Sequence, residues 1–531
     1  MIISLSVLVI TIIVSGTYAL YKAQLSKNIG VNTTTHGLAY YINYVKGTDI
    51  TAATLNPSTS YEGGASSDIE FWKKDDSYDI YGKIELTVNT IGTNLKNSAA
   101  LKYAVVNNGN VLKEGSLKGT TSGSKVTILK NLYLEQTKQI YTVYVWLDNS
   151  EELGNISNES LSISVDCTAS LQKETAASYI TSLYTNASKT SATNNGITYN
   201  YANIYDTDSD NNTSGGLMND RLGGTTTSLD GGNIRYYGAN PNNYIYFNCS
   251  DYSNQTSSTC ETWRIIGVFD GKLKLIRGSQ IGAYSWDNKN TSTGAESAYG
   301  KNDWTTARLM KLLNPSDYYI NDNNDKDSEG NYLGYSLYYN SASGKCYSGQ
   351  NNATVDCDFT STGIKDTTKN MIAETTYYLG GWTDSEIYPN EIYEYERGTT
   401  VYTGRPTTPW TGKIALAYPS DYGYAADLNQ CKDKTLYDYD NSICTSNNWM
   451  KAIIAPNNGS NYGWLLTPYS GDSYGAWRVN SSGNVYSNHY ESYIAYGAAP
   501  VLSLSSELSI ESGGGSSSNP YKLSASAINL R

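Results

Sequence analysis

The chain is short of histidine: it has only His36 and His489 among 531 residues. A serine or cysteine hydrolase needs a base beside its nucleophile, and a zinc site needs several nitrogen or sulfur ligands. Two histidines so far apart in the sequence, with no Cys-x-x-Cys motif, supply neither. The sequence therefore argues against a histidine-based catalytic triad and against a zinc site.

Basic residues are also scarce. The chain has 38 Lys and Arg against 50 Asp and Glu, which gives a net charge of -12, and the basic residues form no cluster. Proteins that bind nucleic acid neutralise phosphates with clustered Lys and Arg. We therefore expect no nucleic-acid partner.

Phenylalanine is rare, with 4 residues, whereas the chain has 50 Tyr and 10 Trp. Tyrosine suits both half-buried strands and binding surfaces. A codon bias towards A and T would also enrich Tyr, so its total alone does not identify a surface. Trp263, Trp304, Trp464 and Trp477 lie inside apolar patterns and are predicted to be core residues.

The seven cysteines form three pairs of close neighbours in the sequence, with one residue left over. A disulfide across each short loop would contribute roughly 3 kcal/mol by restricting the unfolded chain. Other connectivities stay open at this point, but the pattern favours an oxidising, extracellular location. The neighbours are Cys249 with Cys260, Cys346 with Cys357, and Cys431 with Cys444, and Cys167 is the residue left over.

The chain opens on the apolar run IISLSVLVITIIV, and Thr17 and Ala19 follow it with the spacing that signal peptidase reads. Residues 1–22 are therefore predicted to be a signal peptide, or alternatively a membrane anchor over residues 2–20. No other contact with a membrane is expected. Basic residues follow the run instead of preceding it, so we expect the true start to lie upstream.

Short β-branched and aromatic runs with period two succeed one another from YGKIELTVNTI to LSISVDC. They predict an all-β sandwich over residues 23–168. Residues 169–195 are predicted to be a helical linker, residues 196–510 a second domain, and residues 511–531 a Gly/Ser-rich segment and tail.

The second domain mixes strand and helix signals. TWRIIGVFDGKLKLIRG predicts a hairpin with Asp270 and Gly271 at its turn. NDWTTARLMKLLN predicts a helix capped by Asp303, and a second helix is expected over residues 364–379. KIALAYPSDYGYA, GWLLTP, AWRV and APVLSL are interpreted as strands, so the domain is α+β with long loops.

The N-terminal segment YTVYVWLDNSEELGN, with LSISV after it, resembles the β-sandwich of camelysin and related biofilm-matrix fibre proteins. The resemblance covers about 130 residues and includes no catalytic motif. It implies a structural role for this part of the chain.

The C-terminal half resembles a bacterial surface domain of unknown function. The resemblance rests on YFNC, WRIIGVFDGKLKLIR, YSWD, GKNDWTTARLMKLLN, GWLLTP, GDSYGAWRVNSSGNV and YGAAPVLSL, in this order between about residues 240 and 510. Two residues differ from the usual pattern of this family: Ala499 stands where Arg is usual, and Leu465 stands where Trp is common. More distantly, the layout is similar to C-type-lectin-like domains and to the formylglycine-generating enzyme fold. This similarity in layout implies a C-type-lectin-like domain with disulfide-tied loops.

Each of two acidic runs places several oxygen ligands within one loop, but neither run has the glutamate at the twelfth position of an EF-hand loop. We therefore favour solvated acidic loops and predict no metal or cofactor. Calcium in these runs, or a lectin-type calcium site through Asn302 and Asp303, stays an open alternative. The two runs are Asp206, Asp208 and Asp210, and Asp325, Asp327 and Glu329.

Carboxylates such as Glu374, Asp421 and Asp427 are the candidates for a glycan hydrolase, which needs two at the right separation. That separation cannot be read from a sequence, and Asp and Glu are usually solvated surface residues. The cysteines look structural, which argues against formylglycine-generating activity. We predict a protein that is not an enzyme, with no catalytic residue.

The stretch YGAWRVNSSGNVYSNHYESYIAYGAAPVL alternates apolar framework with polar and aromatic residues. We expect its SSGN turn to close a hairpin and its polar residues to contact a ligand. The predicted ligand-binding residues are Asn480, Asn484, Tyr486, Asn488, His489, Tyr490, Ser492 and Tyr493.

These observations together predict an exported bacterial cell-surface recognition or adhesion protein, extracellular or anchored by residues 2–20. Its C-terminal domain would bind a glycan or a surface protein. A structural subunit of an extracellular matrix fibre, joined by donated strands, is one alternative, and the carboxylate-based hydrolase is the other.

Overall fold

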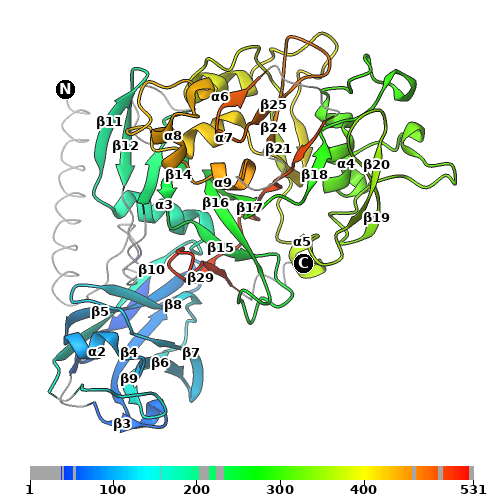
Figure 1. Ribbon diagram of the computed structural model, residues 1–531. Helices are drawn as coiled ribbons and strands as arrows, with labels where there is room; N and C mark the ends of the chain where they lie inside the picture. The colour runs from blue at the N-terminus through cyan, green and yellow to red at the C-terminus, as the bar shows by residue number, and fades with distance from the viewer. Residues whose placement is uncertain are drawn as a thin grey trace, which may run out of the picture. The chain divides into compact units, whose positions relative to one another are not determined.

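The computed structural model describes residues 38, 41–51, 55–156, 158–202, 214–222, 232–456, 462–487 and 494–524. These residues divide into two compact units, one up to Glu174 and the other from Thr175 onward (Figure 1). The predicted leader, residues 1–22, lies outside the described residues. In the part of the chain that is described, no helix is both long and apolar enough to cross a membrane.

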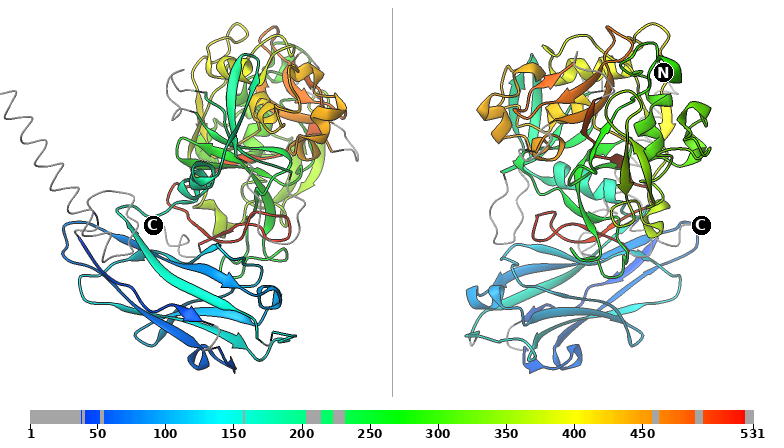
Figure 2. Two further views of the ribbon diagram at one scale, coloured as in Figure 1. Left: turned by 90° about the vertical axis from the view of Figure 1, so that its left-hand side faces the viewer. Right: turned by 45° about the vertical axis from the view of Figure 1, so that its right-hand side comes forward.

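The first unit consists of two sheets around one hydrophobic core, and its strands lie in two layers (Figure 2). The six-stranded sheet has the order β1-β4-β9-β6-β7 with β3 beside β9, and the four-stranded sheet has the order β2-β10-β5-β8. The elements are β1 (Ile42–Val45), β2 (Ile50–Thr51), β3 (Pro57–Ser58), β4 (Ala65–Lys73), β5 (Tyr81–Ile91), α2 (Thr93–Asn97), β6 (Leu101–Asn107), β7 (Asn110–Ser116), β8 (Lys125–Tyr133), β9 (Ile140–Asp148) and β10 (Leu161–Ser170).

The period-two pattern of the sequence is confirmed in this unit. Along β5, Ile84, Leu86 and Val88 are fully buried, whereas the residues between them are only partly covered. β5 pairs with β10 and β8 on either side, so its buried face points to the shared core. The predicted runs YGKIELTVNTI and LSISVDC thus coincide with β5 and β10.

The second unit is also mostly β, with several antiparallel sheets and a few short helices. Its largest sheet has the order β11-β12-β13-β14-β16-β17-β28-β23 with β15 beside β16, and a five-stranded sheet has the order β18-β27-β24-β25-β26. The large sheet comprises β11 (Thr190–Asn194), β12 (Ile197–Ala202), β13 (Ser214–Asn219), β14 (Ile234–Asn240), β15 (Tyr244–Phe247), β16 (Glu261–Phe269), β17 (Lys272–Arg277), β23 (Ile414–Ala415) and β28 (Val501–Ser503). The five-stranded sheet comprises β18 (Ala283–Ser285), β24 (Gly463–Pro468), β25 (Ala476–Val479), β26 (Val485–Tyr486) and β27 (Ala495–Gly497).

Short paired strands and helices complete the second unit. The paired strands are β19 (Ser343–Tyr347) with β20 (Thr354–Asp358), β21 (Thr375–Tyr377) with β22 (Trp410–Gly412), and β29 (Ile510–Ser512) with β30 (Lys522–Leu523). The helices are α3 (Ala176–Asn186), α4 (Arg308–Leu313), α5 (Asp366–Lys369), α6 (Pro389–Arg397), α7 (Pro419–Tyr424), α8 (Ser442–Ser446) and α9 (Lys451–Ile454).

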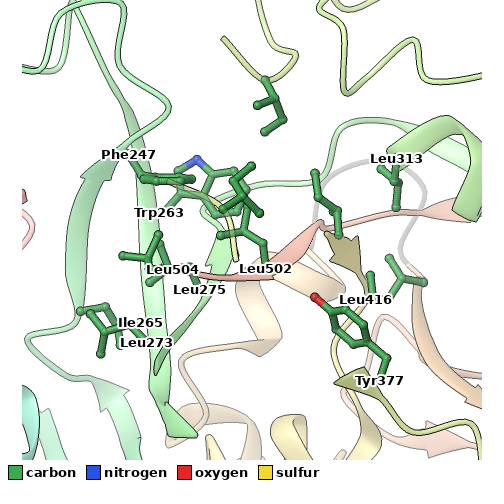
Figure 3. Packing of buried hydrophobic residues seen from close by; sticks show 14 of the residues in the cluster. Phe247, Trp263, Ile265, Leu273, Leu275, Leu313, Tyr377, Leu416, Leu502 and Leu504 are labelled. Atoms are coloured by element: carbon green, nitrogen blue, oxygen red, sulfur yellow. The ribbon is translucent and has the colours of Figure 1, made fainter. Parts of the chain in front are cut away.

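The hairpin of β16 and β17 carries the main core of this unit. Asp270 and Gly271 have φ values of 48° and 71°, the left-handed geometry of the predicted two-residue turn. Figure 3 shows Trp263 and Leu275 of the hairpin beside Leu502 of β28. All three side chains are fully buried, so burial of the hairpin fixes its register.

Three disulfides join the cysteines that are neighbours in the sequence, as predicted. They tie loops in the second unit and support an extracellular or otherwise oxidising location. The bridges are Cys249–Cys260, Cys346–Cys357 and Cys431–Cys444.

Four sequence predictions about helices and strands need correction or refinement. The helix expected over 364–379 is wrong, because only α5 and the strand β21 form there. The strand expected over KIALAYPSDYGYA ends at Ala415, and α7 begins at Pro419, where a proline without an N–H is tolerated. Asp303 caps the 3₁₀ turn η5 (Trp304–Thr306), and α4 begins only at Arg308. α3, predicted as part of a linker, packs into the core of the second unit.

A buried ion network joins three elements of the second unit. Arg235 of β14 donates from Nε to Asp220 at 2.5 Å and from Nη1 to Asp421 of α7 at 2.9 Å. Lys274 of β17 pairs with the other oxygen of Asp421. Burial alone would raise the pKa of Asp421, but Lys274 and Arg235 hold it below its usual value. Asp421 is therefore ionised, and each charge depends on the others.

We expect Arg235→Met to lower the free energy of unfolding by about 3–5 kcal/mol, because it leaves buried carboxylates without their cation. Urea denaturation of the full chain measures this. Lys345→Met is the matched control, since Lys345 pairs with Asp356 on the surface, where both are more than half exposed, and should cost at most about 1 kcal/mol. Equal effects of the two substitutions would contradict the assigned role of the network.

Cys167 is the one free cysteine, and it is fully buried in the core of the first unit. Burial raises the pKa of its thiol well above the usual value, which makes it unreactive. We expect Ellman's reagent to detect no thiol in the native protein and one per chain after denaturation without reduction. Cys167→Ser should abolish that signal, and rapid labelling of the native protein would show that the site opens readily.

Candidate functional site

The five-stranded sheet of the second unit gathers aromatic side chains and one arginine on one face. Residues paired across neighbouring strands share a face of a sheet. Trp464 of β24 pairs with Arg478 of β25, which also pairs with Tyr486 of β26. On the other side, Tyr496 of β27 lies 4.7 Å from Trp464, measured between ring centroids. The row therefore runs from the buried interior towards the edge of the sheet at β26.

Arg478 stands within this row, and no carboxylate of the described residues pairs with it. Its side chain is only 7% exposed, and its Nε and Nη1 atoms are buried with no hydrogen-bond partner. The guanidinium lies 4.6, 5.3 and 5.2 Å from the ring centroids of Tyr462, Tyr486 and Tyr496. Cation–π contacts stabilise the charge but leave its N–H donors unused.

Tyr437 of the 3₁₀ turn η8 (Leu436–Asp438) extends this arrangement to the surface. It is 39% exposed, and its ring meets that of Tyr486 edge-on at 5.5 Å. Burial raises the pKa of Tyr486, so its phenol stays protonated at neutral pH. We call Arg478, Tyr437, Tyr462, Tyr486 and Tyr496 the tyrosine–arginine cluster.

Asn480 and Asn484 hold the turn beside the cluster. The Oδ1 atom of Asn480 accepts from the backbone N–H groups of Gly483 at 2.9 Å and Asn484 at 3.0 Å. Gly483 has a φ of 106°, which favours glycine at that position. Asn484 is buried and donates from Nδ2 to the carbonyl of Tyr437 at 2.6 Å. Asn480 thus shapes the turn of the hairpin, and Asn484 joins the hairpin to the element that carries Tyr437.

The structure describes three of the eight predicted ligand-binding residues. Tyr486 belongs to the tyrosine–arginine cluster, and Asn480 and Asn484 shape the turn next to it. The other predicted residues, Asn488, His489, Tyr490, Ser492 and Tyr493, lie outside the described residues.

Sequence reasoning missed Arg478, although one signal could have found it. Trp477 and Val479 are fully buried in the core on the opposite side of the sheet. Strand alternation then requires the residue between them to face the other way. Tyr437 and Tyr462 were beyond reach, because only the tertiary fold brings them to Arg478.

The described acidic run is a structural feature. Asp325 is fully buried and accepts from Arg308 Nε at 2.7 Å and from Lys311 Nζ at 2.8 Å. Asp327 Oδ1 accepts two backbone N–H groups and closes a turn. Within the described ranges, no group of three or more His, Cys, Asp or Glu residues is placed to hold a metal ion. The run from Asp206 to Asp210 lies outside those ranges.

Asn302 and Asp303, the other calcium candidates, already have partners. Asn302 Nδ2 donates to three carbonyls of the segment 469–475, and its Oδ1 accepts from Arg405 Nε at 2.8 Å. Asp303 Oδ1 caps the next turn by accepting from the N–H of Thr305 at 3.1 Å. Both side chains organise loops in the structure.

A cavity of about 270 Å³ contains the most exposed of the hydrolase candidates. Glu374 lines it, together with Lys274 and Arg397. Lys274 pairs with Asp421, and Arg397 Nη1 lies 3.2 Å from Glu396 Oε2. Both oxygens of Asp421 are bound to cations, so this carboxylate is not free to transfer protons.

Asp427, the third hydrolase candidate, closes a turn by accepting from the N–H of Asn429 at 3.0 Å. It does not line the cavity that contains Glu374. The described residues therefore do not present these two carboxylates to one shared cavity, as a glycosidase would require.

Glu396 was not among the candidates, yet it has the most perturbed carboxyl near this cavity. It is fully buried and accepts from the N–H of Ser420 at 2.9 Å and from its Oγ at 2.6 Å. Burial raises the pKa of Glu396 to about 7, although Arg397 opposes the rise. Both of its oxygens are engaged with the chain itself, which indicates a structural role.

The raised pKa of Glu396 predicts a pH dependence of stability. The folded protein keeps a proton that the unfolded chain loses near the ordinary value of 4.5. The free energy of unfolding should therefore fall as the pH rises from about 4.5 to about 7, by up to about 3 kcal/mol from this group. In urea denaturation, Glu396→Gln should show less of this decline than the parent.

Burial also raises the pKa of Asp287, to about 6. Asp287 therefore lowers the free energy of unfolding with rising pH as Glu396 does, and this part of the decline remains in both proteins. Glu374→Gln alters an exposed carboxyl and serves as the control, which should follow the parent. Parallel pH profiles for the parent and Glu396→Gln would contradict the assignment.

Neither a protein-family model nor a curated protein matches this chain. Among solved structures, PBCV-1 VP54 fitted into a cryo-EM reconstruction of the virophage Sputnik aligns over 92% of this chain and 87% of its own. The aligned residues are 8% identical and the TM-score is 0.11. So low a similarity carries no argument about fold or function.

Proposed function

We propose that the protein is an exported cell-surface recognition protein without catalytic activity. Its first unit would be a β-sandwich that acts as a stalk or anchor, as the likeness of its sequence to matrix-fibre proteins implies. Its second unit would be a C-type-lectin-like domain that binds a glycan or a surface protein. The observation that carries the proposal is Arg478, a buried cation with unused donors among tyrosine rings.

The tyrosine–arginine cluster has the chemistry of a contact surface. Tyr and Arg are enriched among the residues that dominate binding energies, because they combine a large apolar contact area with directional donors. The Nε and Nη1 atoms of Arg478 lack acceptors, so an oxygen of a ligand that reached them would gain a charge-assisted hydrogen bond. Tyr437 and Tyr486 provide flat faces for a sugar ring or for apolar side chains.

The disulfides support a location outside the cytoplasm. Bridges of this kind persist in oxidising compartments, and each one here closes a loop of the second unit. A recognition domain at the cell surface would benefit from loops that are fixed before a ligand arrives, because preorganisation lowers the entropic cost of binding.

A structural subunit of a matrix fibre is the second candidate, and β7 favours it. This strand lies at the edge of the six-stranded sheet, and Val111 and Leu112 on it are 43% and 41% exposed. An exposed apolar edge strand is a template for pairing with another chain. Fibres of the purified chain in electron micrographs would support this role, and monomers alone in light scattering would count against it.

The proposed recognition function is tested by binding of the full chain to glycan arrays and to panels of cell-surface proteins. We expect Tyr437→Ala, Tyr486→Ala and Arg478→Met each to weaken binding at least about tenfold, because each removes part of the contact. Tyr299→Ala, at an exposed tyrosine outside the cluster, is the matched control and should bind like the parent. A parent that binds nothing, or cluster variants that bind as well as the control, would overturn the proposal.

A further inference from the structure

A second cavity in the second unit, of about 460 Å³, contains another arginine, Arg264, with which none of the described carboxylates pairs. Arg264 of β16 and Arg277 of β17 line it on one side, and Trp449 and Ile453 line it on another. Volumes of this size are typical of sites for small molecules. The cavity is separate from the tyrosine–arginine cluster, because the two share no lining residue.

Arg264 uses only some of its N–H donors in hydrogen bonds to the described residues. It is 7% exposed, donates from Nε to Asn243 Oδ1 at 2.5 Å and directs Nη2 to the carbonyl of Pro241 at 3.4 Å. Its guanidinium lies 3.6 Å from the ring centroid of Tyr244 and 4.9 Å from that of Trp449. Its Nη1 atom donates to no described residue, so one strong donor remains available.

The neighbouring arginine shows what Arg264 lacks. Arg277 donates to both oxygens of Glu261, from Nη2 at 2.9 Å and from Nε at 3.2 Å, so its charge is neutralised. Arg264 has no such carboxylate in the described chain. Burial lowers the pKa of Arg264 to about 10, and Tyr244 offsets this only in part. Arg264 is still charged at neutral pH, so the lining carries one unbalanced positive charge in a chain of net charge -12.

We infer that this cavity binds a small molecule with a single carboxylate, which pairs with Arg264 while its apolar body lies against Trp449 and Ile453. One unbalanced positive charge matches a monoanion. A phosphate dianion would leave a negative charge without a partner in a partly buried site, which is costly. A planar carboxylate also fits the fork of a guanidinium.

The inference does not depend on the proposed recognition function, and the two are tested by different substitutions. The experiment is isothermal titration calorimetry of the full chain with phenylacetate. Phenylacetamide, which has the same shape without the charge, and inorganic phosphate are titrated in parallel. We expect saturable binding of phenylacetate, and binding of the other two that is at least about tenfold weaker.

Three variants locate the site. Arg264→Met keeps an apolar stem beside Tyr244 and should weaken phenylacetate binding at least about tenfold. Ala452→Trp alters an exposed residue of the lining and should block the cavity with Arg264 still in place. Lys345→Met is the control, since it removes an exposed cation that does not line the cavity, and should bind phenylacetate like the parent.

Absence of phenylacetate binding to the parent would overturn the inference. So would equal binding of phenylacetamide or phosphate, or unchanged binding by Arg264→Met and Ala452→Trp. If Arg264→Met does not fold, Ala452→Trp alone decides: retained binding contradicts the site, and lost binding supports it.

Discussion

A buried cation requires a negative charge close by, and much of the second unit is organised by that requirement. Arg235, Arg308 and Arg405 lie in the interior, and each of them reaches a carboxylate. Asp421 pairs with both Arg235 and Lys274, and thereby connects a helix to two strands of the large sheet. Such pairs add little net stability over an apolar core, but removing one member of a pair strongly destabilises the fold. They therefore specify which segments must meet.

Two buried arginines have no carboxylate partner among the residues that the structure describes, and both follow a buried tryptophan in the sequence. Trp263 and Trp477 face apolar cores, so strand alternation turns Arg264 and Arg478 to the other side. Aromatic rings stand around each guanidinium in the place where an acid stands elsewhere. The rings reduce the cost of burying the charge, yet they accept no strong hydrogen bond. Because rings stand where an acid would otherwise stand, N–H donors of both arginines have no acceptor within the described part of the chain.

Local signals predicted much of the fold. Period-two patterns identified the strands of the first unit, Asp270 and Gly271 identified the hairpin, and the spacing of the cysteines identified the disulfides. Each of these depends on residues that are close in the sequence. The helix α7 was missed because its start depends on Pro419 and on Asp421, whose oxygens are fixed by distant partners.

The candidate site was less accessible to sequence reasoning. Arg235 and Asp421 are 186 positions apart, and no periodicity indicates such a pair. Tyr486 was predicted from its hairpin, but its neighbours Tyr437 and Tyr462 come from other elements. That no described carboxylate pairs with Arg478 or Arg264 is likewise a property of the packed chain. A sequence displays the arginine but not the environment that leaves its donors free.

Among the residues that the structure describes, the second unit has two buried arginines, Arg264 and Arg478, with which no carboxylate pairs. A crystal structure of the protein soaked in sodium bromide tests it most directly, because anomalous scattering locates bound anions. The account predicts bromide beside Arg264 and Arg478 and none beside Arg235 or Arg308, whose carboxylates already occupy the same positions. Bromide at neither of the first two arginines, or equally at the paired ones, would contradict it.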